Sequence, residues 1–253
     1  MTRRPTAGLI LIGDELLSGK VVDTNGSFLI TELRTIGIDL GEIAVIGDDV
    51  DIIAERIASF STRFDHVFTS GGIGPTHDDR TMVAVARAFD TELLEHTALR
   101  REIERYFGDD PEQQRVWARM AMVPERCELL AFRGLRWPIY KMSNVYVLPG
   151  IPEIFRRQFE LVRDRLQGTP VSIRTIYFAI GEGPLVRRLT EAVERFARVS
   201  IGSYPVILSR GFRTRVTLES TDVAELEAAT SWLVAQFERE AVEEVVGDER
   251  VLR

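Results

Sequence analysis

Short apolar runs alternate with amphipathic segments from residue 7 to about residue 90 of the chain. Three short, β-type runs predict buried strands, at residues 7–12, 38–46 and 65–68. Three segments with apolar residues at helical spacing predict helices, at 25–36, 51–60 and 82–89. This alternation predicts an α/β fold with a mainly parallel sheet and helices on both faces. In such a fold, ligands bind beyond the carboxyl ends of the strands.

The pattern changes after residue 90 and again near Gly168. Residues 91–137 read as an excursion over the site, with helices expected at 98–107 and 112–120, before a strand at 143–148 and a helix at 153–166. Beyond Gly168 we expect a smaller α+β domain, with strands at 172–179, 206–209 and 213–219 and helices at 184–196 and 223–239. The predicted domains are therefore 1–167 and 168–253.

Composition and charge narrow the classes of partner. The chain has 253 residues, of which 45% are hydrophobic, and a net charge of −7 that is spread along it, so no nucleic-acid partner is expected. The single cysteine, Cys127, excludes internal disulfides, favours a cytoplasmic location and is expected to fill the core. Since no apolar run is long enough to cross a bilayer, no membrane association is expected either.

A glycine-rich loop, Ser70–Thr76, is the strongest chemical signal. Gly71, Gly72 and Gly74 lie between a predicted strand and a predicted helix, where backbone N–H groups and the helix dipole favour an anion. Because glycine has no Cβ, the backbone can approach a ligand closely at these positions. The loop is therefore expected to hold phosphate.

Two pairs of acidic residues are expected at the same edge of the sheet. Asp14 and Glu15 follow the first strand, and Asp78 and Asp79 follow the glycines. Four carboxylates around one cleft repel one another unless a metal ion binds them or some are protonated, and hard cations prefer carboxylate oxygen. Two interpretations stay open: a metal site, or solvated loop acids with one aspartate capping the next helix.

Two nucleotide-binding motifs are excluded by spacing. The segment 13–21 is not a Walker A loop, because five residues separate its glycines and Val21 follows the lysine. The glycine loop is not a dinucleotide fingerprint, since His77, which we expect to face solvent, stands at the third glycine position. Asp23 precedes the helix that begins at Asn25, so helix capping and ligand contact are both open for it.

Three segments together resemble the molybdopterin-binding-like domain of CinA-like proteins and of the N-terminus of eukaryotic FAD synthase. They are Gly13–Gly19 with Asp23–Asn25, Gly71–Thr81, and Leu148–Glu153. The aspartate at position 14 resembles the FAD synthase branch, which has aspartate there, whereas many CinA-like members have threonine. The later segment also resembles the small domain that follows in CinA-like proteins. Neither an amidohydrolase nor an adenylyl-transferring domain is recognised, so the sequence assigns neither nicotinamide-nucleotide deamidation nor FAD synthesis.

The resemblance implies a metal-dependent pyrophosphatase that cleaves FAD or ADP-ribose and releases AMP. In this interpretation Asp14, Asp78 and Asp79 bind Mg²⁺, Mn²⁺ or Co²⁺, Asp79 is also catalytic, and either Glu15 or Asp23 is the base. The substrate-binding residues would be Ser70, Gly71, Gly72, Gly74, Thr76, Asn25, Pro149 and Gly150.

Two alternatives follow from the same resemblance. One is a non-catalytic protein that binds molybdopterin or a nucleotide. The other is an enzyme of molybdenum-cofactor assembly that transfers an adenylyl group or a metal. In each case the partner is a small nucleotide or pterin ligand, and the small domain is expected to build a homo-oligomer.

Overall fold

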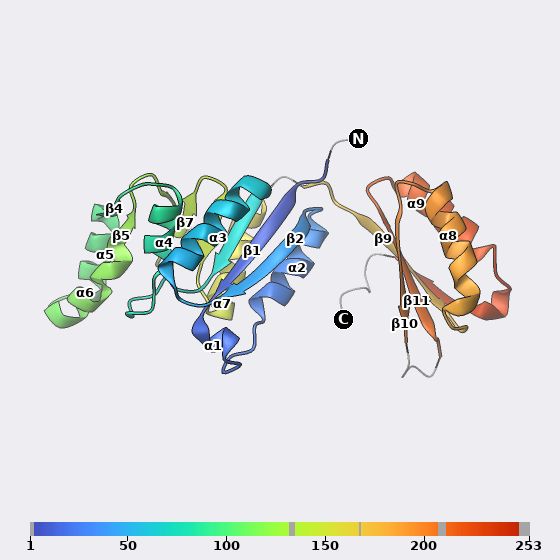
Figure 1. Ribbon diagram of the computed structural model, residues 1–253, viewed down its shortest axis with the longest axis horizontal. Coiled ribbons are helices and arrows are strands. Elements are labelled where there is room, and N and C mark those ends of the chain that lie inside the picture. The colour runs from blue at the N-terminus through green and yellow to red at the C-terminus, as the bar shows by residue number, and fades with distance from the viewer. Residues whose placement is uncertain (1–2, 132–134, 167, 207–210, 248–253) are drawn as a thin grey trace. The chain divides into compact units, whose positions relative to one another are not determined.

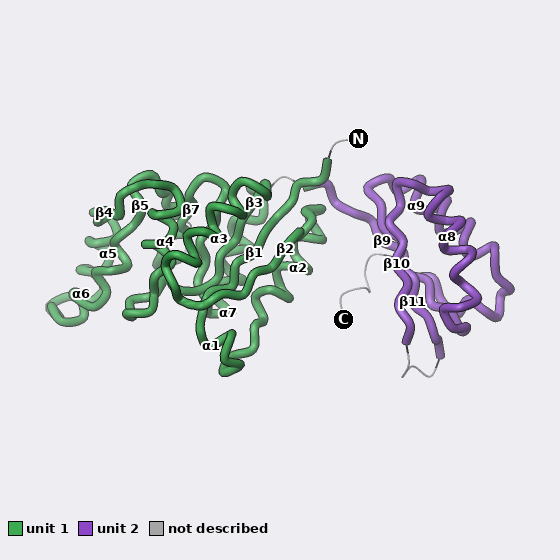
Figure 2. The backbone as a smooth tube through the Cα atoms, in the orientation of Figure 1, with its two compact units in different colours: residues 1–168 green, residues 169–253 purple. Residues whose placement is uncertain are grey.

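The structure is a computed structural model that describes residues 3–131, 135–166, 168–206 and 211–247. It divides into two units, residues 1–168 and 169–253, each with its own sheet and hydrophobic core (Figure 2). Among the described residues, no helix combines the length and apolar character needed to cross a bilayer.

Unit 1 is built on a six-stranded sheet with the order β2-β1-β3-β8-β7-β6 (Figure 1). The first four strands in that order are parallel: β2 (Asp39–Ile46), β1 (Thr6–Ile12), β3 (His66–Ser70) and β8 (Val145–Leu148). At the other edge, β7 (Ile139–Met142) pairs antiparallel with β8, and β6 (Glu128–Leu130) pairs antiparallel with β7. The predicted mainly parallel sheet is therefore confirmed.

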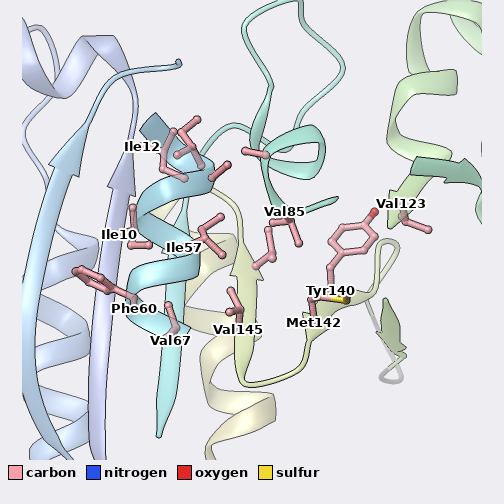
Figure 3. Close-up of a cluster of buried hydrophobic side chains, with 14 of the residues drawn as sticks. Ile10, Ile12, Ile57, Phe60, Val67, Val85, Val123, Tyr140, Met142 and Val145 are labelled. Carbon is pink, nitrogen blue, oxygen red and sulfur yellow. The ribbon is translucent and has the colours of Figure 1, made fainter. Parts of the chain in front are cut away.

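Alternate residues of β1 serve two cores on opposite faces of this sheet. Leu9 and Leu11 pack with α2 (Asn25–Thr35) and α7 (Pro152–Arg163). Ile10 and Ile12 pack with α3 (Val50–Arg63), α4 (Thr81–Ala88) and α5 (Thr97–Phe107), in the cluster drawn in Figure 3. Successive side chains of a strand point to opposite faces, so a continuous apolar run buries both sides of a sheet. This explains why helices cover both faces.

Residues 91–137, the predicted excursion over the site, contain more regular secondary structure than expected. A two-stranded antiparallel sheet pairs β4 (Leu93–Glu95) with β5 (Met122–Pro124). The helix expected at 112–120 is α6 (Pro111–Trp117), followed by a 3₁₀ turn, η1 (Ala118–Ala121). The strand expected at 143–148 is β8, which begins only at Val145 because Ser143, with a positive φ of 55°, lies in the turn that joins it to β7. Strand β7 itself was not predicted.

Unit 2 is a four-stranded antiparallel sheet with helices on one face (Figure 1). Its strands, in sheet order, are β10 (Ser200–Pro205), β11 (Thr214–Ser220), β9 (Ser172–Phe178) and β12 (Val242–Val246). The helices are α8 (Val186–Arg195) and α9 (Val223–Val234), with 3₁₀ turns at η2 (Gly183–Leu185) and η3 (Arg239–Ala241). The predicted smaller α+β domain is confirmed.

Three element predictions in unit 2 need correction. The strand expected at 206–209 lies mostly outside the described residues, and the observed strand β10 ends before it, at Pro205. The last helix ends at Val234 rather than Arg239. Strand β12 was not predicted because its sequence, with two adjacent glutamates, lacks the alternation of a half-buried strand.

Candidate functional site

One buried side chain joins the three loops that the sequence places at the same sheet edge. Asn25, only 4% exposed, begins α2, and its Nδ2 donates to Ser70 Oγ at 2.9 Å and to the carbonyl of Gly150 at 2.9 Å. Asp23 fixes this turn, because its carboxylate accepts from the N–H groups of Asn25 and Gly26, each at 3.0 Å. The Asp23 carboxylate therefore satisfies N–H groups of the first turn of α2, whose N-cap residue is Thr24. Asn25 and Ser70 act as scaffold between the loops.

The glycine loop is fixed between β1, β8 and the start of α4. Gly71 and Gly72 have positive φ angles of 109° and 65°, which suit glycine. The N–H of Gly71 donates to the carbonyl of Leu148 at 3.1 Å. Thr81, the first residue of α4, donates its hydroxyl to the Gly71 carbonyl and its N–H to the Gly72 carbonyl, both at 2.9 Å. Gly71 and Gly72 thus lie beside Thr81, where α4 starts. Residues 73–80 form a loop that projects outward between Gly72 and Thr81.

Asp79 closes this outward loop and does not cap α4. Its Oδ2 accepts from the N–H of Thr76 at 2.7 Å and from the Thr76 hydroxyl at 2.5 Å. Arg119, at η1, donates to the carbonyls of Thr76 and Asp79 and ties the loop to the excursion. The N-cap residue of α4 is Arg80, without a side-chain hydrogen bond, so the open interpretation in which Asp78 or Asp79 caps this helix is wrong.

A cavity of about 400 Å³ opens against the glycine loop. This volume lies within the range of roughly 300–1,000 Å³ that is typical of ligand pockets. The predicted site residues that line it are Glu15, Gly71, Gly72, Gly74, Asp79, Pro149 and Gly150. The other predicted site residues are not among its described lining residues: Asp14, Asp23, Asn25, Ser70, Thr76 and Asp78. The cavity therefore brings together two carboxylates from separate loops, Glu15 and Asp79.

The predicted metal ligands do not form a ready-made cage. Within the described residues, no group of three or more histidine, cysteine or acidic side chains is arranged to hold a metal ion. Asp14, Asp78 and Asp79 therefore do not converge as predicted. Magnesium, however, is commonly bound by only one or two carboxylates together with phosphate oxygens of the substrate. Glu15 and Asp79, on the wall of one cavity beside a glycine loop, fit that second arrangement.

Asp14 is engaged instead with Asp48, which follows β2. The Asp48 carboxylate accepts from the Asp14 N–H at 3.0 Å, and the Asp48 N–H donates to Asp14 Oδ1 at 3.4 Å. Partial burial, followed by the negative charges of Asp14, Glu15 and Asp78, raises the pKa of the Asp48 carboxyl above its ordinary value of 3.8. Asp48 thus adds a further negative charge to the acidic edge, and sequence reasoning did not identify it.

Asp48→Asn is expected to gain stability relative to the wild type as pH rises. A carboxyl whose pKa is raised by folding binds its proton more tightly in the folded state, and this binding stabilises the folded protein. The wild type loses that stabilisation as pH rises from about 4 through the folded-state pKa. Asparagine keeps an oxygen for the Asp14 N–H but does not ionise. Urea unfolding of both proteins between about pH 4 and pH 7 measures the difference.

The control for this experiment is Asp164→Asn, which removes a carboxylate that is 91% exposed. A difference in the free energy of unfolding between Asp48→Asn and the wild type that stays constant with pH would contradict the assignment. A difference that matches the one between Asp164→Asn and the wild type would contradict it as well.

The remaining titratable candidates stay outside the site. The His77 side chain is 95% exposed, as the sequence suggested. Burial raises the pKa of the Cys127 thiol to about 11, and the residue packs against the core of unit 1. Several residues that the sequence did not single out also contact this region. Among them are Arg119 on the loop and Trp117, Trp137 and Gln158 on the cavity wall.

Two family models match different parts of this chain. Residues 8–168 match the family model described as a probable molybdopterin binding domain. The chain belongs to this molybdopterin-binding domain family. Residues 170–246 of this family member match a second model, the middle domain of FAD synthase. The predicted resemblance to CinA-like proteins and to the FAD synthase N-terminus is confirmed.

Individual relatives of this molybdopterin-binding family member come from several lineages. A probable FAD synthase of Caenorhabditis elegans is 31% identical, over 92% of this chain and 50% of that protein. Protein TK1472 of Thermococcus kodakarensis is 34% identical, over 90% of this chain and 95% of that protein. The crystal structure of CinA from Thermoplasma acidophilum, described there as of unknown function, aligns with a TM-score of 0.57 and 26% identity, covering 64% of this chain and 97% of that one. The chain spans about half the length of the probable FAD synthases that it matches.

Proposed function

We propose that this protein hydrolyses the diphosphate of an adenine-dinucleotide-like substrate, such as FAD or ADP-ribose, with a divalent metal ion, and releases AMP. The observation that carries the proposal is the single cavity in which the glycine loop meets Glu15 and Asp79. The similarity to proteins named probable FAD synthase, and to the middle domain of FAD synthase, supports a nucleotide as the substrate.

The proposed roles follow from where each group lies. The backbone of Gly71, Gly72 and Gly74 lines the cavity and approaches the diphosphate there. Asp79 would hold the metal ion together with phosphate oxygens of the substrate, since magnesium is often bound by one or two carboxylates and substrate phosphates. When bound, such an ion neutralises developing charge and lowers the pKa of a coordinated water molecule.

Glu15 is the residue we propose as general base. It lines the cavity, whereas both oxygens of Asp23, the other candidate, accept backbone N–H groups at the start of α2. Water attacks the phosphorus of the adenylyl half, its proton passes to Glu15, the new P–O bond forms and the anhydride P–O bond breaks. AMP and the remaining phosphate monoester are the two products.

The direct test incubates the purified protein with FAD or ADP-ribose and Mg²⁺, Mn²⁺ or Co²⁺ and measures AMP by chromatography. We expect AMP with at least one metal and none after chelation. Absence of AMP with every substrate and metal would overturn the proposal. Ligand binding without turnover, insensitive to chelator, would indicate the non-catalytic binding protein instead.

A pair of variants separates the two candidate bases. Glu15→Gln is expected to lower kcat by about 100-fold or more, because general-base catalysis typically contributes 10²–10⁴-fold. Asp23→Asn is expected to keep near wild-type kcat, since asparagine caps helices about as well as aspartate. Steady-state AMP release by both variants gives the comparison. The reverse ranking of the two variants would assign the base to Asp23.

A further inference from the structure

Half of the cavity wall has no role in phosphate chemistry. Beyond the glycine loop and the two carboxylates, the wall is formed by aromatic and apolar side chains that include Trp117, Trp137 and Tyr140. Ile151 and Ile154, on the same wall, are 56% and 40% exposed. A diphosphate gains nothing from such a surface, whereas the organic part of a ligand is typically bound by hydrophobic and aromatic side chains. We therefore expect this half of the cavity to bind a second, apolar part of the ligand.

The two tryptophans form a stacked pair at this wall. Trp117, at the end of α6, and Trp137, just before β7, have ring centroids 6.2 Å apart and planes only 11° from parallel. Phe107 supports Trp117 from behind the cavity wall, at 5.3 Å between centroids. Both indoles are only partly buried, so they do not simply fill the core. Partly exposed, parallel aromatic rings in a cavity provide a platform on which a planar ring stacks.

A buried amide on the same cavity wall has an unused acceptor. Gln158 is 4% exposed, and its Oε1 accepts no hydrogen bond from any residue that the structure describes. It follows Ile154 by four positions, so α7 presents both side chains to the cavity. A buried polar atom without a partner is rare in native proteins and needs an explanation. An N–H donor on the edge of a bound ring supplies the missing partner.

We propose that Trp117, Trp137 and Gln158 form a recognition subsite for a planar nitrogen heteroaromatic ring that carries an N–H donor beside an acceptor. The ring stacks on the indoles, and Gln158 accepts its N–H. The subsite rests on the proposed function only in that the ring belongs to the diphosphate substrate. Both ends of a dinucleotide have this chemistry, the isoalloxazine imide and the adenine amino edge, so phosphate-free probes of each are needed.

The test measures binding of riboflavin and of adenosine by isothermal titration calorimetry. We expect the wild type to bind one of the two, and Trp117→Leu and Trp137→Leu to weaken its affinity by about 5-fold to 100-fold, the range expected for loss of one stacking contact. The matched control is Tyr106→Leu, because Tyr106 packs on Phe107 but is not among the described lining residues of the cavity. Unchanged affinity in both tryptophan variants would overturn the stacking platform.

Gln158→Met tests the hydrogen bond without depending on the tryptophans. Methionine is similar in size and removes the buried unpaired amide, so the variant is expected to be as stable as the wild type or more stable, yet to bind the ring about 10-fold more weakly. A ligand whose donor is blocked, N3-methylriboflavin or N6,N6-dimethyladenosine, is expected to bind the wild type and Gln158→Met equally. An equal loss of affinity for blocked and unblocked ligands would exclude the hydrogen bond.

The two proposals fail in different ways. Ring binding without AMP release would overturn the proposed hydrolysis and leave the subsite intact. Release of AMP by a wild type that binds neither riboflavin nor adenosine would overturn the subsite and leave the hydrolysis intact.

Discussion

Asp79→Asn is expected to lower kcat for AMP release by about 100-fold or more, without loss of folded protein. The Asp79 carboxylate lines the cavity, and its Oδ2 also accepts two hydrogen bonds from Thr76. Asparagine keeps an oxygen that can accept from Thr76 but removes the negative charge. The variant therefore separates the charge needed for metal binding from the contact that shapes the loop.

Two comparisons make this result specific. Asp78→Asn removes a neighbouring carboxylate that is 60% exposed and is not among the described lining residues, so its kcat is expected to stay near the wild-type value. A higher metal concentration is expected to restore part of the activity of Asp79→Asn, because the remaining ligands still bind the ion weakly. Wild-type kcat in Asp79→Asn, or an equal loss in Asp78→Asn, would show that Asp79 does not hold the metal.

Gly71→Ala is expected to destabilise unit 1 by about 3 kcal/mol or more. Gly71 has a φ of 109°, and a Cβ at this position would stand 2.2 Å from the carbonyl oxygen of Ile12, which is the last residue of β1. Because this neighbour is backbone in the centre of the sheet, it has no rotamer through which to move away. Urea unfolding followed by tryptophan fluorescence reports the loss, since Trp117 and Trp137 both lie in unit 1.

Gly19→Ala is the matched control for backbone conformation. Gly19 also has a positive φ, 71°, but a Cβ there would meet no described atom within 4 Å. Its replacement is expected to cost only about 1–2 kcal/mol, the usual penalty for placing an L-residue in the left-handed region. If Gly71→Ala costs no more than Gly19→Ala, the close approach of the glycine loop to β1 is not what requires glycine.

The position of the candidate site could be predicted because its signals are local. Apolar runs define where β1, β3 and β8 end, and polar or glycine-rich segments follow each of them. Parallel strands end at the same edge, so the three following loops must lie near one another. The hydrogen bonds from Asn25 to Ser70 and Gly150 show the loops in contact.

The function of each acidic side chain could not be predicted in the same way. Asp14, Glu15, Asp78 and Asp79 are equivalent in the sequence as acids beside glycine loops. The direction in which each side chain points depends on partners that are distant in the chain. Asp14 and Asp48, for example, exchange hydrogen bonds. A carboxylate turns toward whichever donor the fold supplies, and only the fold specifies that donor.

The amino-acid sequence by itself determined the alternation of strands and helices and the glycine loop, because each depends on residues close together in the chain. It also determined the family of this protein, through the order of three such local segments. The tertiary structure alone decided that Glu15 and Asp79 share a cavity while the Asp23 carboxylate binds N–H groups at the start of a helix. It also brought Trp117, Trp137 and Gln158 onto one wall from three separate segments of the chain. Such a wall has no periodicity in sequence, since it is created only when the excursion packs beside the sheet.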